Sequence, residues 1–438
     1  MSANIPYKGK HALLVALLLM LLLPAVQAKF KVVKMDALGG YTASTAPHPE
    51  LDWAGLQNNS YQTDLEHYLE ARVGFREWFI RLRNQFSYTF LNVARANRVL
   101  VGRDNVLYEE RPVLTYLGQD LMADSVVQHH VRRFRAVQDT LARRGKLLVF
   151  VVAPSKASFM PEYLPSYYRQ QKPGKSNYQA YSAALRAAGV NFLDLSQAFR
   201  AWKDTTSHPL FPRGGIHWSS YGAKLAGDTL LCYVEKLYGH ELRDFRLVPG
   251  DITREPRESD NDIAKAMNLM WPAAAYPMAY PTAVAQPLKP GQRQPNLLLI
   301  GDSFCWPIMY PFINEAFDNK QSRFWYYNTE VSWPDEHPEG RAVGALDRKQ
   351  QYLSRDIIMI LFTEYNMIHL DGGFSDDAYN IFTPYTRADS ARIKAFETRI
   401  AAIPDLADKW WSKSAETGLS LQQLIHRQAV AQYDSIRH

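Results

Sequence analysis

Residues 296–304 read Asn-Leu-Leu-Leu-Ile-Gly-Asp-Ser-Phe, an apolar run that stops abruptly at Gly301-Asp302-Ser303. A short apolar run bounded by a turn signal predicts a buried strand. The serine would then stand at the carboxyl edge of that strand, where open parallel sheets bind their ligands. Such a turn exposes the Ser303 hydroxyl and directs the following backbone N–H groups to one point, so Ser303 is a candidate nucleophile.

Helical patterns that end in glycine alternate with short apolar strands along the middle of the chain. A helix over residues 129–144 and Gly145 precede a strand over 146–153, and a helix over 178–188 and Gly189 precede a strand over 190–195. The same rhythm continues with a helix over 221–238 and strands over 297–300, 323–327 and 356–362. This pattern predicts an α/β fold, a mostly parallel sheet flanked by helices on both faces.

The segments around this pattern divide the chain further. Residues 61–98 show helical spacing interrupted by Gly74, which predicts two amphipathic helices, and a hairpin-like pattern follows over 99–108. We predict a signal peptide or anchor over 1–28, a linker over 29–60, an α/β domain over 61–385 with a proline-rich insertion or lid over 240–295, and a helical segment over 386–438.

The amino-terminal segment has the features of an export signal. Basic residues precede an apolar run over 12–23, and small residues follow it. The run is near the lower limit for a membrane span, about 17–25 residues, so a retained anchor stays an alternative to a cleaved signal. Positive charge just beyond the run disfavours a standard cleaved signal; it is carried by Lys29, Lys31 and Lys34. In both cases we expect the rest of the chain to be exported.

Composition narrows the class of protein. Charged residues make up 21% and hydrophobic residues 47% of the 438 residues, which is typical of a globular protein. The net charge of +6 is mild and no basic cluster with interleaved aromatics occurs, so we expect no nucleic-acid partner. Two cysteines, Cys232 and Cys305, make no disulfide framework. No metal-ligand spacing or phosphate-binding loop is present, so no metal or cofactor is predicted.

A second candidate lies in a glycine-containing loop. Residues 211–223 read Phe-Pro-Arg-Gly-Gly-Ile-His-Trp-Ser-Ser-Tyr-Gly-Ala, directly before a helix that Ser219 or Ser220 can cap. His217 therefore stands at a loop-to-helix junction, where side chains often reach an active site. A histidine near a serine can take its proton during acyl transfer, whereas a capping or packing role is the structural alternative.

Together these motifs resemble the SGNH-hydrolase-like domain of the alginate O-acetyltransferase family. The resemblance rests on Gly-Asp-Ser-Phe after a strand and on His-Trp-Ser-x-Tyr-Gly-Ala before a helix. It extends in the same order over residues 60–370, through the segments at 74–76, 101–108, 152–156 and 160–165. The family implies that Ser303 is the acyl-accepting nucleophile, that His217 is its general base, and that the Ser303 N–H helps to form the oxyanion hole. Asp302 is expected to brace the turn.

The chain departs from the family pattern at one position. The family usually has Asp-x-His-Trp, with the aspartate orienting the imidazole, but this chain has Gly215 two residues before His217. A Ser–His pair held by a backbone carbonyl is one solution. An acid from elsewhere is the other, and Asp194, at a strand end, and Asp204 are the candidates.

Three further residues follow predicted strands at the same sheet edge. Lys156 either faces the site, where it would bind an anionic substrate or partner, or lies on the surface. Glu364 and Asn366 are expected to shape the site, and Asn366 is a candidate for a second oxyanion donor.

The leading hypothesis is an exported, membrane-associated O-acetyltransferase. It would pass an acetyl group through Ser303 to hydroxyls of an exported polysaccharide, and the resemblance implies a membrane-bound O-acyltransferase as the partner that supplies the acetyl group. We expect a periplasmic protein held at the inner membrane by its amino-terminal segment. A carbohydrate acetylesterase and a catalytically silent scaffold are the alternatives.

Overall fold

A six-stranded sheet forms the centre of the protein. The computed structural model describes residues 7–40, 46–406, 410, 420–434 and 436–437. The strands lie in the order β11-β10-β9-β12-β3-β4, and every neighbouring pair is parallel except β10 and β11. Their bounds are β3 (Leu147–Ala153), β4 (Phe192–Asp194), β9 (Leu297–Gly301), β10 (Arg323–Tyr326), β11 (Glu330–Trp333) and β12 (Ile357–Thr363). The predicted α/β fold is confirmed, and the antiparallel edge strand β11 is an addition that the sequence pattern did not predict.

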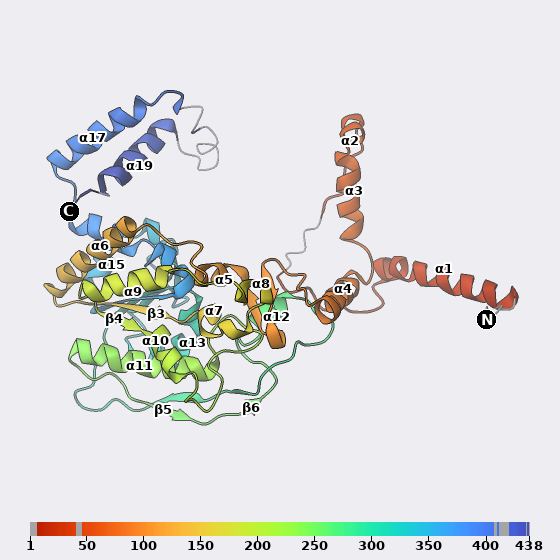
Figure 1. The fold of residues 1–438 in the computed structure, drawn as a ribbon, viewed down its shortest axis with the longest axis horizontal. Coiled ribbons are helices and arrows are strands. Elements are labelled where there is room, and N and C mark those ends of the chain that lie inside the picture. The colour runs from red at the N-terminus through yellow and green to blue at the C-terminus, as the bar shows by residue number, and fades with distance from the viewer. Residues whose placement is uncertain (1–6, 41–45, 407–409, 411–419, 435, 438) are drawn as a thin grey trace.

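Helices cover both faces of this sheet (Figure 1). One layer contains α6 (Asp124–Ala142), α9 (Asn177–Ala187), α15 (Arg348–Leu353) and α16 (Phe374–Phe382), and the other contains α10 (Leu195–Trp202), α11 (Ser220–Tyr238) and α13 (Trp306–Ile308). Successive residues of β3 point to opposite faces, so Phe150 packs in one layer and Val149 in the other. This double burial explains why the central strands are apolar without alternation.

The register places the carboxyl ends of four strands side by side. Gly301, at the end of β9, pairs with Leu361 of β12 on one side and with Tyr326 of β10 on the other. The last residue of β12, Thr363, pairs with the last residue of β3, Ala153. The residues that follow these strands therefore meet at one edge of the sheet.

The amino-terminal part extends away from the sheet (Figure 1). It contains α1 (Tyr7–Phe30), α2 (Trp53–Asn58), α3 (Ser60–Glu70) and α4 (Arg76–Leu91). The antiparallel hairpin of β1 (Val99–Val101) and β2 (Leu107–Glu109) follows, and it packs into the core cluster beside the central sheet. Helix α1 is long and apolar enough over residues 9–30 to cross a membrane. Both helices expected within residues 61–98 are present as α3 and α4, although most of their large apolar side chains are exposed.

The proline-rich segment after α11 has more regular structure than its composition suggests. Strand β5 (Phe245–Val248) pairs with β8 (Thr282–Ala285), and β6 (Ile252–Thr253) pairs with β7 (Met278–Ala279), both antiparallel. Between these pairs lies the short helix α12 (Asp262–Ala266).

The remaining helices are short or lie at the carboxyl end. Helices α5 (Glu110–Tyr116), α7 (Lys156–Phe159), α8 (Ser166–Arg169) and α14 (Asn314–Ala316) connect the larger elements. Helices α17 (Arg387–Ala401) and α19 (Leu421–Asp434) pack together around a small apolar cluster of their own. Buried Arg133 of α6 links this pair to the main domain, because its guanidinium lies 3.3 Å from the Asp434 carboxylate.

Candidate active site

The turn after β9 presents the serine as its sequence predicts. Asp302 is fully buried, and its Oδ1 accepts a hydrogen bond from the Phe304 N–H at 3.0 Å. Its Oδ2 accepts from the Thr363 N–H at 2.8 Å and from Asn366 Nδ2 at 2.7 Å. These bonds tie the turn to the end of β12 and leave no oxygen of Asp302 directed at a substrate. The turn therefore fixes where Ser303 stands.

The structure brings His217 to this serine, although 86 residues separate them in the chain. His217 Nε2 lies 2.8 Å from Ser303 Oγ. The loop is fixed on both sides of the imidazole. Trp218 is fully buried against Phe304, and the Ser219 hydroxyl caps α11 by accepting from the Gly222 N–H at 2.9 Å. Nucleophile and base thus have the hydrogen-bond geometry of a catalytic pair.

The acid that the sequence lacks two positions before His217 comes from the proline-rich segment. Asp262, the first residue of α12, places Oδ2 2.6 Å from His217 Nδ1. Its other oxygen accepts from the N–H groups of Ile216, at 2.9 Å, and Ile263, at 2.7 Å. These bonds set the carboxylate in one orientation, with the proton of the imidazole on Nδ1 and Nε2 free to accept from Ser303.

Gly215 explains why the acid is displaced. A Cβ at this position would lie 2.4 Å from the Ser259 carbonyl oxygen and 2.9 Å from the Asp260 carbonyl carbon. The backbone that leads to Asp262 occupies the space that an aspartate side chain at position 215 would need. Glycine is thus the residue that lets this segment approach closely enough to deliver its own carboxylate.

Neither acid proposed from the sequence contacts the histidine. Asp194 caps α10 by accepting from the Gln197 N–H, and it also accepts from the Tyr178 hydroxyl and pairs with Arg186. Asp204 lies in the turn after α10. The prediction that Asp194 or Asp204 orients His217 was therefore wrong. A position at the end of a strand indicates only that a residue lies near the sheet edge. Asp262 could have been found only from its own position, as an acidic residue at the start of a short helix.

Lys156 is buried and holds the loop that carries His217 through two hydrogen bonds. It is 3% exposed, and its Nζ donates to the carbonyl oxygens of Arg213 at 2.9 Å and Gly215 at 2.8 Å. Burial lowers the pKa of Lys156 to about 7. Both expected roles, an anion ligand and a surface residue, were wrong, because the helix that begins at Lys156 directs the side chain under the loop.

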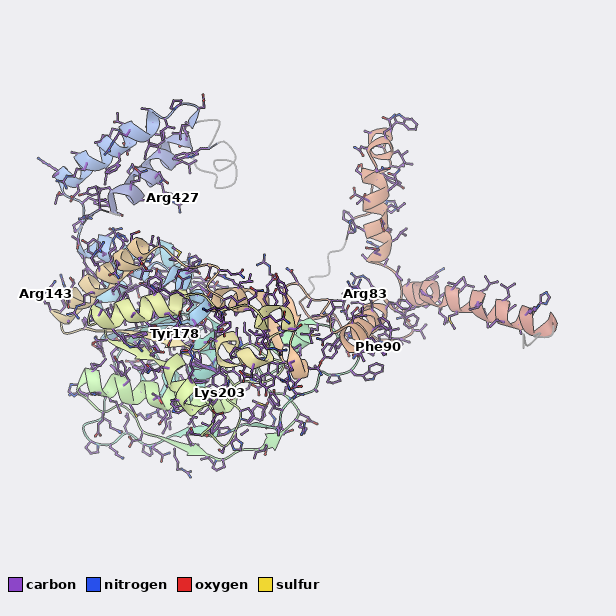
Figure 2. The ribbon with its side chains drawn as sticks, in the orientation of Figure 1. Arg83, Phe90, Arg143, Tyr178, Lys203 and Arg427 are labelled. Carbon is purple, nitrogen blue, oxygen red and sulfur yellow. The ribbon has the colours of Figure 1, made fainter. Side chains whose placement is uncertain are left out.

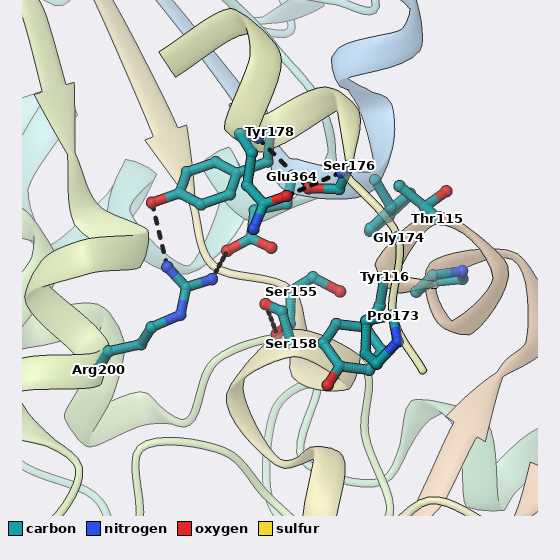
Figure 3. A pocket seen from close by; sticks show the side chains of 13 residues that line it. Thr115, Tyr116, Ser155, Ser158, Pro173, Gly174, Ser176, Tyr178, Arg200 and Glu364 are labelled. Carbon is teal, nitrogen blue, oxygen red and sulfur yellow. Dashed lines mark hydrogen bonds and ion pairs between the residues drawn. The ribbon is translucent and has the colours of Figure 1, made fainter. Parts of the chain in front are cut away.

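Glu364 lines a separate pocket. This cavity of about 320 Å³ is bordered by Ser155, Tyr178 and Arg200 (Figure 3), and Arg200 pairs with Glu364 at 2.9 Å. Burial raises the pKa of Glu364 to about 7. The two cavities that His217 and Ser303 line do not include Glu364, so the expectation that it shapes the serine site is wrong.

Asn366 does not have its expected role, and Tyr326 lies at the site although no role was predicted for it. The Asn366 amide is directed at Asp302, so it braces the turn and is not a free oxyanion donor. Tyr326, the last residue of β10, lies next to Ser303, and burial raises the pKa of its hydroxyl. Tyr326 was not among the predicted site residues, although it ends a predicted strand at the same sheet edge, which was a signal that could have found it.

A serine, histidine and aspartate joined in this order at the edge of a parallel sheet are the arrangement that serine hydrolases and acyltransferases share. No cluster of three or more His, Cys, Asp or Glu side chains with metal-binding geometry occurs among the described residues. The hydrogen bonds that join Ser303, His217 and Asp262 give this site the geometry of serine-dependent acyl chemistry.

Comparison with known proteins gives the family. The family model described as the SGNH hydrolase-like domain of the acetyltransferase AlgX matches residues 99–318, half of the chain. The chain belongs to this family. Ser303 and His217 both lie within the matched segment, as does Asp262.

Individual relatives agree with this assignment. The chain is 30% identical over 246 residues to the probable alginate O-acetylase AlgJ of Pseudomonas aeruginosa, a match that covers 50% of this chain and 57% of AlgJ. It is 28% identical over 113 residues to the alginate biosynthesis protein AlgX of the same organism, covering 25% of this chain and 23% of AlgX. The chain thus spans about half of the first relative and less of the second.

Solved structures are similar at lower identity. The O-acetyltransferase domain of Pseudomonas putida AlgJ aligns with a TM-score of 0.42 and 18% identity, over 65% of this chain and 99% of that domain. Pseudomonas aeruginosa AlgX aligns with a TM-score of 0.41 and 17% identity, over 64% of this chain and 66% of AlgX.

Proposed function

We propose that this protein is an exported O-acetyltransferase that moves an acetyl group through Ser303 to hydroxyls of a polysaccharide. The observation that carries the proposal is His217, held between Asp262 at 2.6 Å and Ser303 at 2.8 Å. The names of the relatives refer to alginate, which supports a polysaccharide such as alginate as the acceptor.

The first half-reaction acylates the serine. Ser303 Oγ attacks the carbonyl carbon of the acetyl donor while His217 Nε2 takes the hydroxyl proton, and Asp262 stabilises the imidazolium that forms. The backbone N–H of Ser303 donates to the oxyanion of the tetrahedral intermediate. The donor then leaves with the proton from His217, and an ester of Ser303 remains.

The second half-reaction transfers the acetyl group. A sugar hydroxyl attacks the ester carbonyl while His217 takes its proton, and collapse of the intermediate returns that proton to Ser303 Oγ. The product is a sugar acetate and the enzyme is regenerated. Water in place of the sugar would make the same site an esterase, so the acceptor decides between the two activities. With Gly215 in place of the usual aspartate, a catalytically silent scaffold was an alternative. Asp262 supplies the carboxylate that position 215 lacks, and this argues against the scaffold.

The donor and the location complete the proposal. Helix α1 would hold the protein at the outer face of the inner membrane, in the periplasm. A membrane-bound O-acyltransferase, the partner that the family resemblance implies, would bring the acetyl group across that membrane.

The test compares Ser303→Ala with Ser166→Ala, an exposed serine of α8, in the producing cell and as purified full-length protein. We expect Ser303→Ala to abolish polymer acetylation and the mass increase of one acetyl group on the protein after incubation with 4-nitrophenyl acetate. Ser166→Ala should retain both. Acetylation of the polymer in Ser303→Ala cells would refute the proposal, and hydrolysis without any acetylated oligosaccharide would favour the esterase.

A further inference from the structure

Two separate cavities reach the serine from different sides. The first, the aromatic cleft, has a volume of about 940 Å³, and the second, the α4 cleft, has about 670 Å³. His217, Asp262 and Ser303 line both of them. A site that only hydrolysed a small ester would need a single entrance, whereas a transferase has to admit a donor and an acceptor.

The aromatic cleft has the surface that a glycan needs. It is lined by Tyr280, Trp306 and Tyr310, and by the prolines Pro281, Pro307 and Pro311. The Tyr310 side chain is 62% exposed, so its ring is available to a ligand. Tyrosine and tryptophan present flat apolar faces with a polar tip, which suits the C–H face and hydroxyl edge of a sugar ring. The volume of this cleft is far larger than an acetyl group requires.

Of the charged side chains that line the aromatic cleft, Lys224, Arg257 and Asp262 have protein partners, whereas Glu258 is exposed. Arg257 pairs with Asp251 at 2.8 Å and lies over the ring of Tyr280. Lys224 is 6% exposed and donates to the Ser220 hydroxyl at 2.8 Å. Tyr280 is buried under Arg257, so the exposed Tyr310 ring and the half-buried Trp306 ring supply the apolar surface that is free for a carbohydrate.

The α4 cleft lies on the side of the membrane helix. Ile80, Arg83 and Asn84 of α4 line it together with the Gly39-Gly40 segment. The chain directly before α4 packs closely against α1. Gly74 approaches the Pro24 carbonyl oxygen so closely that a Cβ on this glycine would lie only 2.1 Å from it. Figure 1 shows α4 beside the end of α1, away from the central sheet.

The outer face of α4 is apolar and exposed, as expected for a helix at a membrane surface. The exposed fractions are 52% for Phe79, 52% for Leu82, 56% for Phe86 and 72% for Phe90. Helical spacing places these side chains along one side, and Figure 2 shows Arg83 and Phe90 at this end of the molecule, far from Arg143, which follows α6. An amphipathic helix rich in Phe and Arg next to a membrane span is typical of the interface with lipid.

We propose that the two clefts divide the two half-reactions. The acetyl donor reaches Ser303 through the α4 cleft, from the membrane side, and the polysaccharide hydroxyl reaches the acetylated serine through the aromatic cleft. This inference rests on the proposed function and adds to it the route of each substrate. Donor and acceptor then occupy different volumes, so the acceptor can be bound while the serine is being acetylated.

The first test is the inhibition pattern of the full-length protein in detergent, with 4-nitrophenyl acetate as donor and alginate oligosaccharide as acceptor. Separate clefts predict that high concentrations of oligosaccharide leave kcat/KM for the ester unchanged within about twofold, because kcat/KM for the ester reports only the acetylation of Ser303. One shared entrance would make the oligosaccharide a competitive inhibitor of the ester, and that result would overturn the inference.

The second test uses one variant for each cleft. Tyr310→Ala should raise the KM for the oligosaccharide about tenfold, equivalent to about 1.4 kcal/mol, and change the single-turnover rate of serine acetylation by less than about twofold. Arg83→Trp should place a rigid ring at the mouth of the α4 cleft and slow acetylation about tenfold when oligosaccharide is saturating, without raising the KM for the oligosaccharide. Arg143→Trp, on the exposed end of α6, is the matched control.

The outcomes separate the two proposals. If the wild-type protein forms no acetyl-serine, the proposed function itself fails. In the other case the wild-type protein forms acetyl-serine while a variant contradicts the division between clefts. This is the case if Tyr310→Ala slows acetylation as much as it raises the KM for the oligosaccharide, or if Arg83→Trp changes only the KM for the oligosaccharide. The division between clefts is then overturned and the acyltransferase activity stands. Near-ultraviolet circular dichroism of both variants excludes misfolding as the cause.

Discussion

Replacement of Asp262 by asparagine tests the site most directly. The carboxylate receives N–H bonds from Ile216 and Ile263 on one oxygen and faces His217 Nδ1 with the other. Asp262→Asn keeps the shape and retains an oxygen for the two backbone N–H groups. It then presents an amide NH₂ group to Nδ1, which favours the tautomer with the proton on Nε2, the nitrogen that has to accept from Ser303.

The expected loss follows from this geometry. In a fully buried triad the same exchange lowers kcat about 10⁴-fold. The Asp262 side chain is 31% exposed, so water replaces part of its effect. We therefore expect Asp262→Asn to lower the rate of serine acetylation about 10³-fold, ~4 kcal/mol in activation free energy. The rate is measured as the burst of 4-nitrophenol and as the labelling of Ser303 by a fluorophosphonate probe.

Two further variants sharpen this measurement. Asp194→Asn, at the acid that the sequence suggested, should change the rate by less than about threefold, because asparagine caps α10 equally well. Gly215→Asp combined with Asp262→Asn should not restore activity, since a side chain at position 215 would overlap the Ser259 carbonyl. Asp262→Asn protein that is folded and keeps its rate within about tenfold of wild type would refute the role of Asp262.

Three other substitutions probe the buried polar groups. Asp302→Ala leaves the N–H groups of Phe304 and Thr363 without an acceptor, and we expect it to lower the free energy of unfolding by about 3 kcal/mol in urea denaturation; a loss under about 1 kcal/mol would contradict its bracing role. Because burial lowers the pKa of Lys156 to about 7 from about 10.4 in the unfolded chain, the unfolded state binds more protons between these values. The free energy of unfolding of wild type relative to Lys156→Met should therefore rise with pH over that range, by about 5 kcal/mol at most, and a difference that does not change with pH would contradict this expectation. Glu364 has the opposite sign: its pKa is raised from 4.5 to about 7, so the free energy of unfolding of wild type relative to Glu364→Gln should fall by about 3 kcal/mol as pH rises through that window, and urea titrations at pH 4.5 and 8 that agree within 1 kcal/mol would exclude it.

Much of the architecture was predictable because its signals are local. Apolar runs such as 297–300 and 356–362 became β9 and β12, and the glycines at positions 145 and 189 end helices with positive φ. The edge strand β11 was not predicted, because its alternation of half-buried and buried residues covers only four residues, the shortest run that such a pattern can have.

The site was predictable to the extent that each residue carried its own context. Ser303 followed a buried strand, and His217 preceded a helix with a serine cap, so both were identified from their immediate neighbours. Lys156, Glu364 and Asn366 also followed strand ends, but the direction of each side chain depends on the helix or turn that comes next, and packing decided it.

The sequence alone therefore determined the sheet, the turn that displays Ser303 and the loop that carries His217, because strand burial, turn chemistry and helix capping depend on adjacent residues. Only the tertiary structure decided which carboxylate orients the imidazole. Asp262 lies 45 residues beyond His217, in a segment whose composition indicated a loop. It reaches the ring because Gly215 has no side chain, which lets the backbone at Ser259 pass where the usual aspartate would stand.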